Sequence, residues 1–353
     1  ESTLPSLIGV STPLERTKAI TKTTRNRPAD LSAFFIFDLS LAIAPSEKTR
    51  VTITAINKVI WLRMIIGVIG NGFVGKATCQ LNCPDIQVLA YDINPDACFP
   101  PGLQLADLNK CELIFISVPT PMSKDGSCHL NIIESVLQDL QKINYSGFLV
   151  LRSTVPVGTS DHLRIHFMPE FLTEKNFIQD FIENKDWFFG LLGDSNDDIF
   201  QQKIKQLFHL AHQHNRIEHN SLHFVTNKEA EMIKMFKNCF LAAKVSFCNE
   251  VYQFCQAKDI NYEQVRQLSC LDERITESHT QVPGHDGKLG FGGTCFPKDT
   301  SSLRYEMVRH GVQPHILNAV IHRNEHVDRP EKDWTHDQGR AVVREDKLNV
   351  SLN

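Results

Sequence analysis

Hydrophobic and polar positions fall into alternating blocks from Met64 onward. Apolar runs of strand length occupy the ranges 64–70, 86–92, 112–118 and 147–154. Amphipathic segments of helix length lie between some of them, at 73–83 and 130–143. Continuous apolar strands separated by helices predict a parallel sheet that helices cover on both faces. Two later apolar runs, at 187–193 and 222–226, flank a polar helix near 196–214 and could extend that sheet.

The pattern changes after residue 226. Residues 227–257 contain no glycine or proline and keep apolar residues at helical spacing throughout, which predicts one long helix. Its apolar face is broad enough for a domain spine or a subunit interface. Shorter helices are expected near 261–270, 297–310 and 314–326. The predicted fold is therefore α/β, with an α/β domain over 64–226 and an all-helical central domain over 227–328.

The two ends of the chain lack this patterning. Residues 1–63 are rich in Ser, Thr, Lys and Arg and are expected to be a disordered or non-native extension; a targeting arm, a disordered tail or sequence upstream of the true start fit equally. Residues 329–353 form a polar tail without strand signals.

Composition narrows the class of protein. A net charge of -4 supplies no large basic field, so we expect neither nucleic acid nor a membrane surface as partner. The sequence contains no run of about 18 apolar residues, so it predicts no membrane-spanning helix. The ten cysteines are scattered without a C-x-x-C pair, and we interpret them as reduced thiols of a cytoplasmic protein rather than as a disulfide framework.

A glycine-rich turn, "GNGFVG", follows the first predicted strand. Gly70, Gly72 and Gly75 have G-x-G-x-x-G spacing, which permits a tight turn, close approach of the backbone to a pyrophosphate, and close packing of helix on strand. Asp92 ends the next strand, where a carboxylate binds the adenosine ribose and repels a 2′-phosphate. We therefore predict a Rossmann domain that binds NAD; a glycine turn with a structural aspartate is the alternative. The predicted contacts from this region are Gly70, Gly72, Phe73, Val74, Gly75 and Asp92.

Two further loops close predicted strands. "SVPTP" spans 117–121 and "RSTVPVGT" spans 152–159. Both end at the sheet edge where open parallel sheets bind ligands, so Pro119, Thr120 and Thr154 are candidate cofactor contacts. Each loop taken alone could simply be stiffened by proline.

Four more stretches complete a recognisable set: "MPEFLTE" (168–174), "EMIKMFKNCFLAAKVSFCNE" (231–250), "DERI" (272–275) and "GFGGTCFPKD" (290–299). With the glycine turn and the two loops, in this order, the chain resembles the UDP-glucose 6-dehydrogenase family, within the UDP-glucose/GDP-mannose dehydrogenases, over roughly 64–328. The resemblance implies oxidation of a nucleotide sugar's primary alcohol to a carboxylate in two NAD-dependent steps through an enzyme-bound thioester. UDP-glucose to UDP-glucuronate is the expected reaction. GDP-mannose or UDP-N-acetyl-hexosamine oxidation, or a non-catalytic NAD-binding remnant, are the alternatives.

By this resemblance Cys295 is the nucleophile. Pro297 suits the first turn of a helix, which would place the thiol at a helix N-terminus beside Lys298, and both features are expected to lower the thiol pKa. A small buried hydrophobe, like the other cysteines, is the alternative reading.

The remaining catalytic roles follow from the same resemblance. Lys234 and Asn238 lie four apart on one helix face and would stabilise the oxygen of the reacting carbon, although such a pair is ordinarily solvated surface. Glu170 would be the general base for thioester hydrolysis, with Thr154 helping to place water. Asp299 would transfer protons with the lysine and could also cap its helix. Glu174 and Lys298 would line the cofactor side of the cleft.

Substrate contacts and partners are implied in the same way. Arg274 would reach the substrate of a neighbouring subunit in a homodimer packed on 227–257; an exposed arginine at a helix end is the alternative. The histidines between 209 and 223 lack a suitably spaced carboxylate or thiol, so no metal is expected. The other predicted substrate contacts, besides Glu170, Lys234 and Asn238, are Phe171, Leu172, Gly290, Phe291, Gly292 and Gly293.

The chain also departs from the family pattern. Too few residues follow Cys295 for the C-terminal nucleotide-binding domain that many members carry, so a short form is expected, or else a fragment or decayed copy. The linker from Arg274 to Gly290 is long, and Met168 stands where asparagine is usual.

Overall fold

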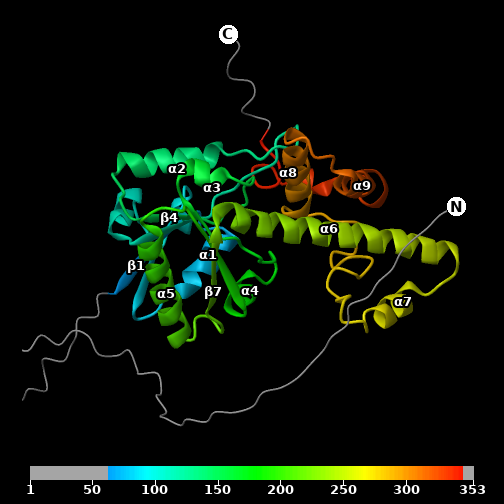
Figure 1. The fold of residues 1–353 in the computed structure, drawn as a ribbon, viewed down its shortest axis with the longest axis horizontal. Coiled ribbons are helices and arrows are strands. Elements are labelled where there is room, and N and C mark those ends of the chain that lie inside the picture. The colour runs from blue at the N-terminus through cyan, green and yellow to red at the C-terminus, as the bar shows by residue number, and fades with distance from the viewer. Residues whose placement is uncertain (1–62, 345–353) are drawn as a thin grey trace, which may run out of the picture. The chain divides into compact units, whose positions relative to one another are not determined.

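The computed structural model describes residues 63–344, and the expectations for residues 1–62 and 345–353 lie outside this part of the chain. Within it, the first half folds around a seven-stranded sheet of order β2-β1-β3-β4-β5-β6-β7 (Figure 1). The strands are β1 (Met64–Ile69), β2 (Ile86–Tyr91), β3 (Leu113–Ile116), β4 (Phe148–Leu151), β5 (His166–Phe167), β6 (Asp186–Leu191) and β7 (Ser221–Thr226).

One pairing in this sheet differs from the parallel arrangement expected from the sequence. Every other neighbouring pair is parallel, but β5 and β6 are antiparallel, with Phe167 opposite Gly190. The two later apolar runs therefore do extend the sheet, in the reverse direction. An antiparallel neighbour needs no crossover back to the opposite edge. The apolar pattern could not reveal this, because a buried strand reads the same in both directions.

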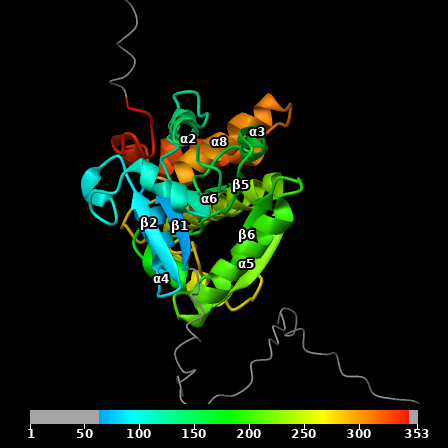
Figure 2. The ribbon, with the colours of Figure 1, turned by 90° about the vertical axis from the view of Figure 1, so that its left-hand side faces the viewer.

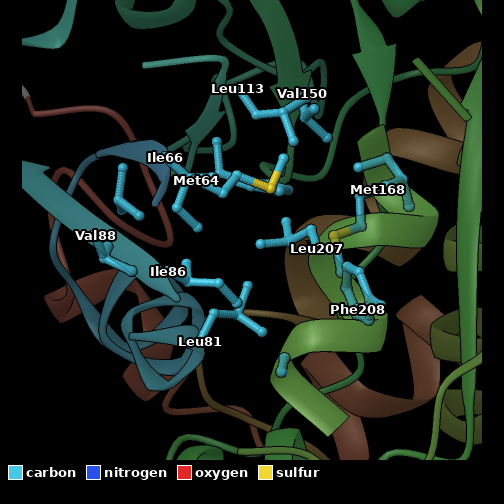
Figure 3. Packing of buried hydrophobic residues seen from close by; sticks show 14 of the residues in the cluster. Met64, Ile66, Leu81, Ile86, Val88, Leu113, Val150, Met168, Leu207 and Phe208 are labelled. Carbon is cyan, nitrogen blue, oxygen red and sulfur yellow. The ribbon is translucent and has the colours of Figure 1, made fainter. Parts of the chain in front are cut away.

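Helices cover both faces of the sheet, as predicted. Successive residues of β3 point to opposite sides: Leu113 and Phe115 enter one apolar cluster, while Ile114 and Ile116 enter the other. Figure 3 shows the first cluster, where strand residues meet Leu207 of α5. The turned view in Figure 2 shows β1 and β2 towards one edge of the sheet and β6 towards the other. The α-helices of this half are α1 (Phe73–Thr78), α2 (Asn131–Lys142), α3 (Thr159–Leu163), α4 (Phe177–Ile182) and α5 (Asp197–Gln213).

The predicted long helix is α6 (Asn227–Ala257), which begins where β7 ends. A capping box fixes its start: the Thr226 hydroxyl accepts from the Glu229 N–H, and the Glu229 carboxylate accepts from the Thr226 N–H. In Figure 1, α8 and α9 lie against one side of α6, and α7 lies near its far end. The predicted fold class, a Rossmann-like domain followed by a helical domain with one long helix, is confirmed. The later helices are α7 (Tyr262–Ser269), α8 (Phe296–Arg309) and α9 (His315–Arg323).

A single turn of π-helix, η4 (Asn324–Asp328), continues α9, and a short 3-10 helix, η5 (Asp333–His336), follows it. Residues 337–344 then return towards the sheet, where Met122 and Val342 form a bridge.

All ten cysteines are free thiols. Among the helices of the described residues, none is both long and apolar enough to cross a membrane.

Candidate active site

The glycine turn lies between β1 and α1, and its three glycines have different surroundings. Gly70 has a φ of +87°, and a Cβ there would lie 2.6 Å from the Ser117 carbonyl oxygen. A Cβ on Gly75 would collide with the carbonyl oxygen of Gly70. At Gly72, by contrast, no heavy atom lies within 4 Å of the Cβ position. A ligand can therefore approach the backbone at Gly72 and at the start of α1, as a pyrophosphate would need.

Asp92 follows β2 and braces this turn. One carboxylate oxygen accepts from the Asn71 N–H at 2.7 Å, and the other accepts from the Asn94 N–H at 2.9 Å. The Asn71 amide in turn donates to the Ala97 carbonyl at 2.7 Å. The residue between the first two glycines thus ties the turn to the end of β2, a role that sequence reasoning did not assign.

The loops after β3 and β4 are joined side by side. The Thr120 hydroxyl donates to the Thr154 carbonyl at 2.8 Å, and the Ser153 hydroxyl donates to the Val118 carbonyl at 2.6 Å. Thr120 and Thr154 are buried, whereas Pro119 is exposed. The structure therefore brings all three predicted residues to the same edge of the sheet as the glycine turn.

Cys295 lies immediately before α8, at its N-cap, with Pro297 in the first turn as the sequence predicts. The expected lowering of its pKa is wrong. Burial raises the pKa of the Cys295 thiol, and Glu170 and Asp299 add to that effect. Lys234 and Lys298 lower the thiol pKa but do not overcome burial.

Lys234 and Glu170 form a buried ion pair beside this thiol. The Lys234 ammonium donates to the Glu170 carboxylate and to the Glu170 carbonyl, each at 2.7 Å. Burial alone would lower the pKa of Lys234, but Glu170, Cys295 and Asp299 raise it, so the amine is protonated. The other Glu170 carboxylate oxygen accepts from the Leu172 N–H at 2.8 Å.

A second buried pair, formed by Lys298 and Asp299 at the start of α8, meets α6 one helical turn beyond Lys234. The Asn238 amide and the Lys298 ammonium both donate to the Asp299 carboxylate. Although burial opposes it, Asp299 raises the pKa of Lys298. Lys234 and Asn238 therefore share one buried face of α6, as the four-residue spacing predicts, and each meets a carboxylate from a different segment.

Glu174 connects the thiol segment to the glycine turn. Its carboxylate accepts from the Thr294 hydroxyl and from the Arg340 guanidinium at 2.9 Å. The Arg340 guanidinium also lies 5.7 Å from the centre of the Phe73 ring. Thr294 and Arg340 were missed by sequence reasoning, since neither carries a local signal.

Phe171, next to Glu170, has a lysine on its ring: the Lys237 ammonium lies 3.5 Å from the ring centre.

The glycines of the 290–293 loop differ in how close their neighbours lie. A Cβ on Gly292 would lie 2.6 Å from the guanidinium carbon of Arg329, whereas Gly293 has no neighbour within 4 Å of that position. A side chain at 292 would therefore have to displace the Arg329 guanidinium, a constraint separate from the predicted approach of a substrate.

Arg274 is not part of this cluster within the chain. Its side chain is 87% exposed and pairs with Asp272 in the turn that follows α7. The histidines considered for metal binding are dispersed: His214 pairs with Asp85, and His223 pairs with Asp186. Across residues 63–344, no group of three or more His, Cys, Asp or Glu side chains is arranged to hold a metal ion.

The fold and this cluster together define a class: a Rossmann-like nucleotide-binding protein whose helical second domain brings a thiol and two buried ion pairs to the glycine-turn edge. Two family profiles match the chain. The NAD binding domain of the UDP-glucose/GDP-mannose dehydrogenase family matches residues 104–211, and the central domain of the same family matches residues 228–326. The chain belongs to the UDP-glucose/GDP-mannose dehydrogenase family, as the sequence motifs predict, and the family domain supports NAD as its cofactor.

Relatives of known name are similar over the same region. A UDP-glucose 6-dehydrogenase of Pseudomonas aeruginosa is 30% identical over 236 residues, which are 62% of this chain and 49% of the relative. UDP-glucose 6-dehydrogenase YwqF of Bacillus subtilis is 30% identical over 286 residues, 68% of this chain and 61% of the relative. The structure of a UDP-glucose dehydrogenase from Pyrobaculum islandicum matches with a TM-score of 0.63 and 25% identity, covering 74% of this chain and 68% of that one. The chain spans about half the length of the first curated relatives it matches.

Proposed function

We propose that this protein is an NAD-dependent nucleotide-sugar 6-dehydrogenase that oxidises UDP-glucose to UDP-glucuronate through a thioester on Cys295. The observation that carries the proposal is the position of Cys295, at the start of α8 and flanked by the Lys234–Glu170 and Lys298–Asp299 pairs. An oxidation that stopped at the aldehyde would need no nucleophile; one that reaches the acid level benefits from a covalent intermediate.

The proposed reaction balances over three events. The primary alcohol loses a proton and a hydride; NAD, which the glycine turn at Gly70, Gly72 and Gly75 would hold, would supply the hydride acceptor. The Cys295 sulfur then adds to the aldehyde carbon, and the thiohemiacetal gives up a second hydride and a proton to become a thioester. Water finally adds to the thioester carbon, the carbon–sulfur bond breaks, and the thiol recovers a proton. The net change is one sugar, two NAD and one water converted to the carboxylic acid, two NADH and two protons, before the acid ionises.

Each buried group has a place in this sequence. The Lys234 ammonium and the Asn238 amide lie on the same buried face of α6. Both can stabilise the oxygen on the reacting carbon of the sugar, which gains negative charge when sulfur or water adds to that carbon. Glu170 binds the Lys234 ammonium and is the proposed general base that deprotonates the attacking water. Thr154, on the loop after β4, would help to place that water. Asp299 links Lys298 and Asn238 and is suited to move a proton between them and the sugar oxygen.

The raised pKa of Cys295 bears on this scheme. A buried thiol that is mostly protonated must lose its proton as it attacks, so a base near the sulfur is required. The positive charge of Lys234 stabilises the thiolate of Cys295. Lys234 cannot itself accept the thiol proton, because its raised pKa keeps it in the ammonium form. The carboxylates of Glu170 and Asp299 are the candidates for this base, because both are close enough to influence the pKa of the Cys295 thiol.

UDP-glucose is preferred because the curated relatives cited above are named for it. A GDP-mannose dehydrogenase of known structure shares the fold at 23% identity, which does not favour that sugar.

We also propose a homodimer packed on α6, in which Arg274, exposed in the turn after α7, reaches the partner's substrate.

The test is to incubate the purified protein with NAD and UDP-glucose, GDP-mannose or UDP-N-acetyl-hexosamines and to count NADH per sugar consumed. Two NADH per UDP-glucose is the expected result. Two NADH with another sugar would correct the substrate, one NADH would remove the thioester from the scheme, and none with any sugar would overturn the enzyme proposal. A Cys295→Ser variant should lose turnover while still binding NAD.

A further inference from the structure

The segment that leads into Cys295 is held by a side-chain amide that no motif identifies. The Phe291 N–H donates to the Asn324 Oδ1 at 2.8 Å, and the Asn324 Nδ2 donates to the Phe291 carbonyl at 2.9 Å. The planar amide thus satisfies both polar groups of one residue's backbone. We call this paired contact the Phe291 clamp.

The clamp is buried and closely fitted. Asn324 is 1% exposed and Phe291 is 5% exposed, so the bonded groups have little access to water. Gly290, with a φ of +65°, lies against Asn324, and a Cβ there would collide with the Asn324 Oδ1. The Gly290 N–H donates in addition to Asn249 of α6 at 3.1 Å. The glycine before Phe291 is therefore required by the clamp itself.

Asn324 directly follows α9 and begins the π-helical turn η4. A π turn inserts an extra residue into a helix and redirects the side chains that follow, and such turns are frequent at functional sites. At the other end of the turn, Arg329 lies beneath Gly292 and is held by Asp286 and Asp333. Two side chains from one turn therefore support consecutive parts of the 290–293 loop.

We propose that Asn324 is a positioning residue for the oxidation described above: by fixing the Phe291 peptide, the clamp sets the course of residues 292–295 and so the place of the Cys295 sulfur relative to the sugar. The inference rests on the proposed function for its catalytic readout. Cys295 lies four residues from Phe291, and Gly292 and Gly293 between them have little stiffness of their own. Without the clamp, the segment would keep its attachment to α8 and the hydrogen bonds of Gly290 to Asn249 and of Thr294 to Glu174, but the Phe291 peptide itself would be unheld.

The chemistry of the clamp supplies a selective test, Asn324→Asp. An ionised carboxylate accepts from the Phe291 N–H but faces the Phe291 carbonyl with a second acceptor. A protonated carboxyl has one donor and one acceptor, like the amide it replaces, and restores both bonds. The aspartate variant should therefore recover as pH falls, whereas Asn324→Ala, which lacks both groups, should not.

Charged groups around the clamp are the same in wild type and variant. Asp328 and Arg329 lie on the same turn, Arg323 ends α9, Glu250 on α6 pairs with Arg323, and Asp286 on the linker pairs with Arg329. Expressing each variant's activity relative to wild type at the same pH removes their contribution.

The experiment measures kcat and KM for NADH formation in wild type, Asn324→Asp, Asn324→Ala and the matched control Asn318→Asp, an exposed α9 asparagine that accepts from Arg304. Because the site is buried, the pKa of the introduced carboxyl should be raised well above its ordinary value. We therefore expect kcat/KM of Asn324→Asp to rise about 10-fold relative to wild type between about pH 9 and pH 6, with a flat ratio for Asn324→Ala and for the control. Equal pH ratios for the aspartate and alanine variants, or wild-type activity in both, would overturn the inference. NAD binding and thermal unfolding show whether each variant is folded.

A second readout separates this inference from the proposed function. The alkylation rate of Cys295 by iodoacetamide, followed by mass spectrometry of its peptide, needs no turnover. If wild type reduces no NAD with any sugar, the proposed function fails, and the clamp is then judged on alkylation alone. A change of at least about 3-fold in Asn324→Ala, with Asn324→Asp returning towards wild type at low pH, supports the clamp; identical rates in all variants contradict it. Because aspartate has the shape of asparagine, that variant remains decisive if the alanine variant does not fold.

Discussion

At Cys295, burial and charge act against each other. Burial raises the thiol pKa, while the Lys234 ammonium is the largest influence that lowers it. The reactivity of the thiol therefore depends on a lysine that is 61 positions away in the sequence and on a different helix.

Replacing Lys234 by Met should raise the Cys295 pKa further, since the main opposing charge is lost. At a fixed pH near 8 the thiolate fraction then falls, and alkylation of Cys295 by iodoacetamide should slow about 10-fold or more. Lys237→Met is the matched control, because its ammonium lies on the Phe171 ring. An unchanged alkylation rate in Lys234→Met, or an equal slowing in the control, would contradict the assignment.

Glu170→Gln should separate the oxidations from hydrolysis. If Glu170 activates water, the variant should release a burst of up to two NADH per site and then turn over about 10² to 10⁴ times more slowly than wild type. Rapid-quench or stopped-flow absorbance measures the burst, and mass spectrometry detects the thioester on Cys295. A variant with normal steady-state turnover would exclude Glu170 as the base.

The positions of residues with local signals could be predicted, and those of residues with distant partners could not. Gly70, Asp92 and Cys295 stand in motifs whose spacing reports their surroundings. Asn324, Arg329 and Arg340 contact residues 33 to 166 positions away, so nothing in their own neighbourhood marks them. The direction of the Cys295 pKa was missed for the same reason, because burial is a property of the folded chain.

Among the elements, α6 depends on a defined start. Thr226→Ala removes the side chain that accepts from the Glu229 N–H and should destabilise the protein by about 1 kcal/mol. Chemical denaturation measures the change in the free energy of unfolding. Glu229→Gln retains a group able to complete the capping box and should lose less. A loss of stability in Glu229→Gln with none in Thr226→Ala would show that charge at the helix start, and not the box, stabilises α6.

Long elements were predictable and short ones were not. The 31 residues of α6 repeat the helical pattern without a break, and each of the six-residue strands β1 and β2 carries its own apolar run. Strand β5 has two residues, too few to show any period, and it sits where the sheet direction reverses. The π turn η4 reads as a continuation of α9.

For the whole molecule, α6 offers a surface for association. Phe236, Phe240, Phe247 and Phe254 are 60 to 67% exposed, and their spacing of four and seven puts them on one side of the helix. We call them the phenylalanine stripe. Exposed apolar patches of this kind commonly mark protein interfaces, which supports the proposed homodimer.

Phe240→Glu should shift the protein from dimer to monomer, because a charge would have to be buried without a partner. Light scattering after size-exclusion chromatography measures the mass. Ile199→Glu is the control, since Ile199 is 50% exposed on α5, away from the stripe. A wild-type mass equal to one chain would refute the dimer, and a dimeric Phe240→Glu variant would place its interface elsewhere.

If Arg274 serves the partner's site, two inactive variants should complement each other. Cys295→Ser and Arg274→Ala subunits, mixed under conditions that exchange partners, form heterodimers with one complete site. Random pairing should restore about a quarter of the wild-type activity. No recovery, with exchange verified by mass spectrometry, would mean that Arg274 acts within its own chain or not at all.

Helix α6 has a buried face carrying Lys234 and Asn238 and an exposed face carrying Phe236 and Phe240, so the two sets alternate along the same turns. A rigid helix cannot rotate one set without moving the other. In the proposed dimer, any ligand that turns the helix would change the association constant, and thermodynamic reciprocity requires association to change that ligand's affinity by the same factor. Affinity for the sugar would then vary with protein concentration.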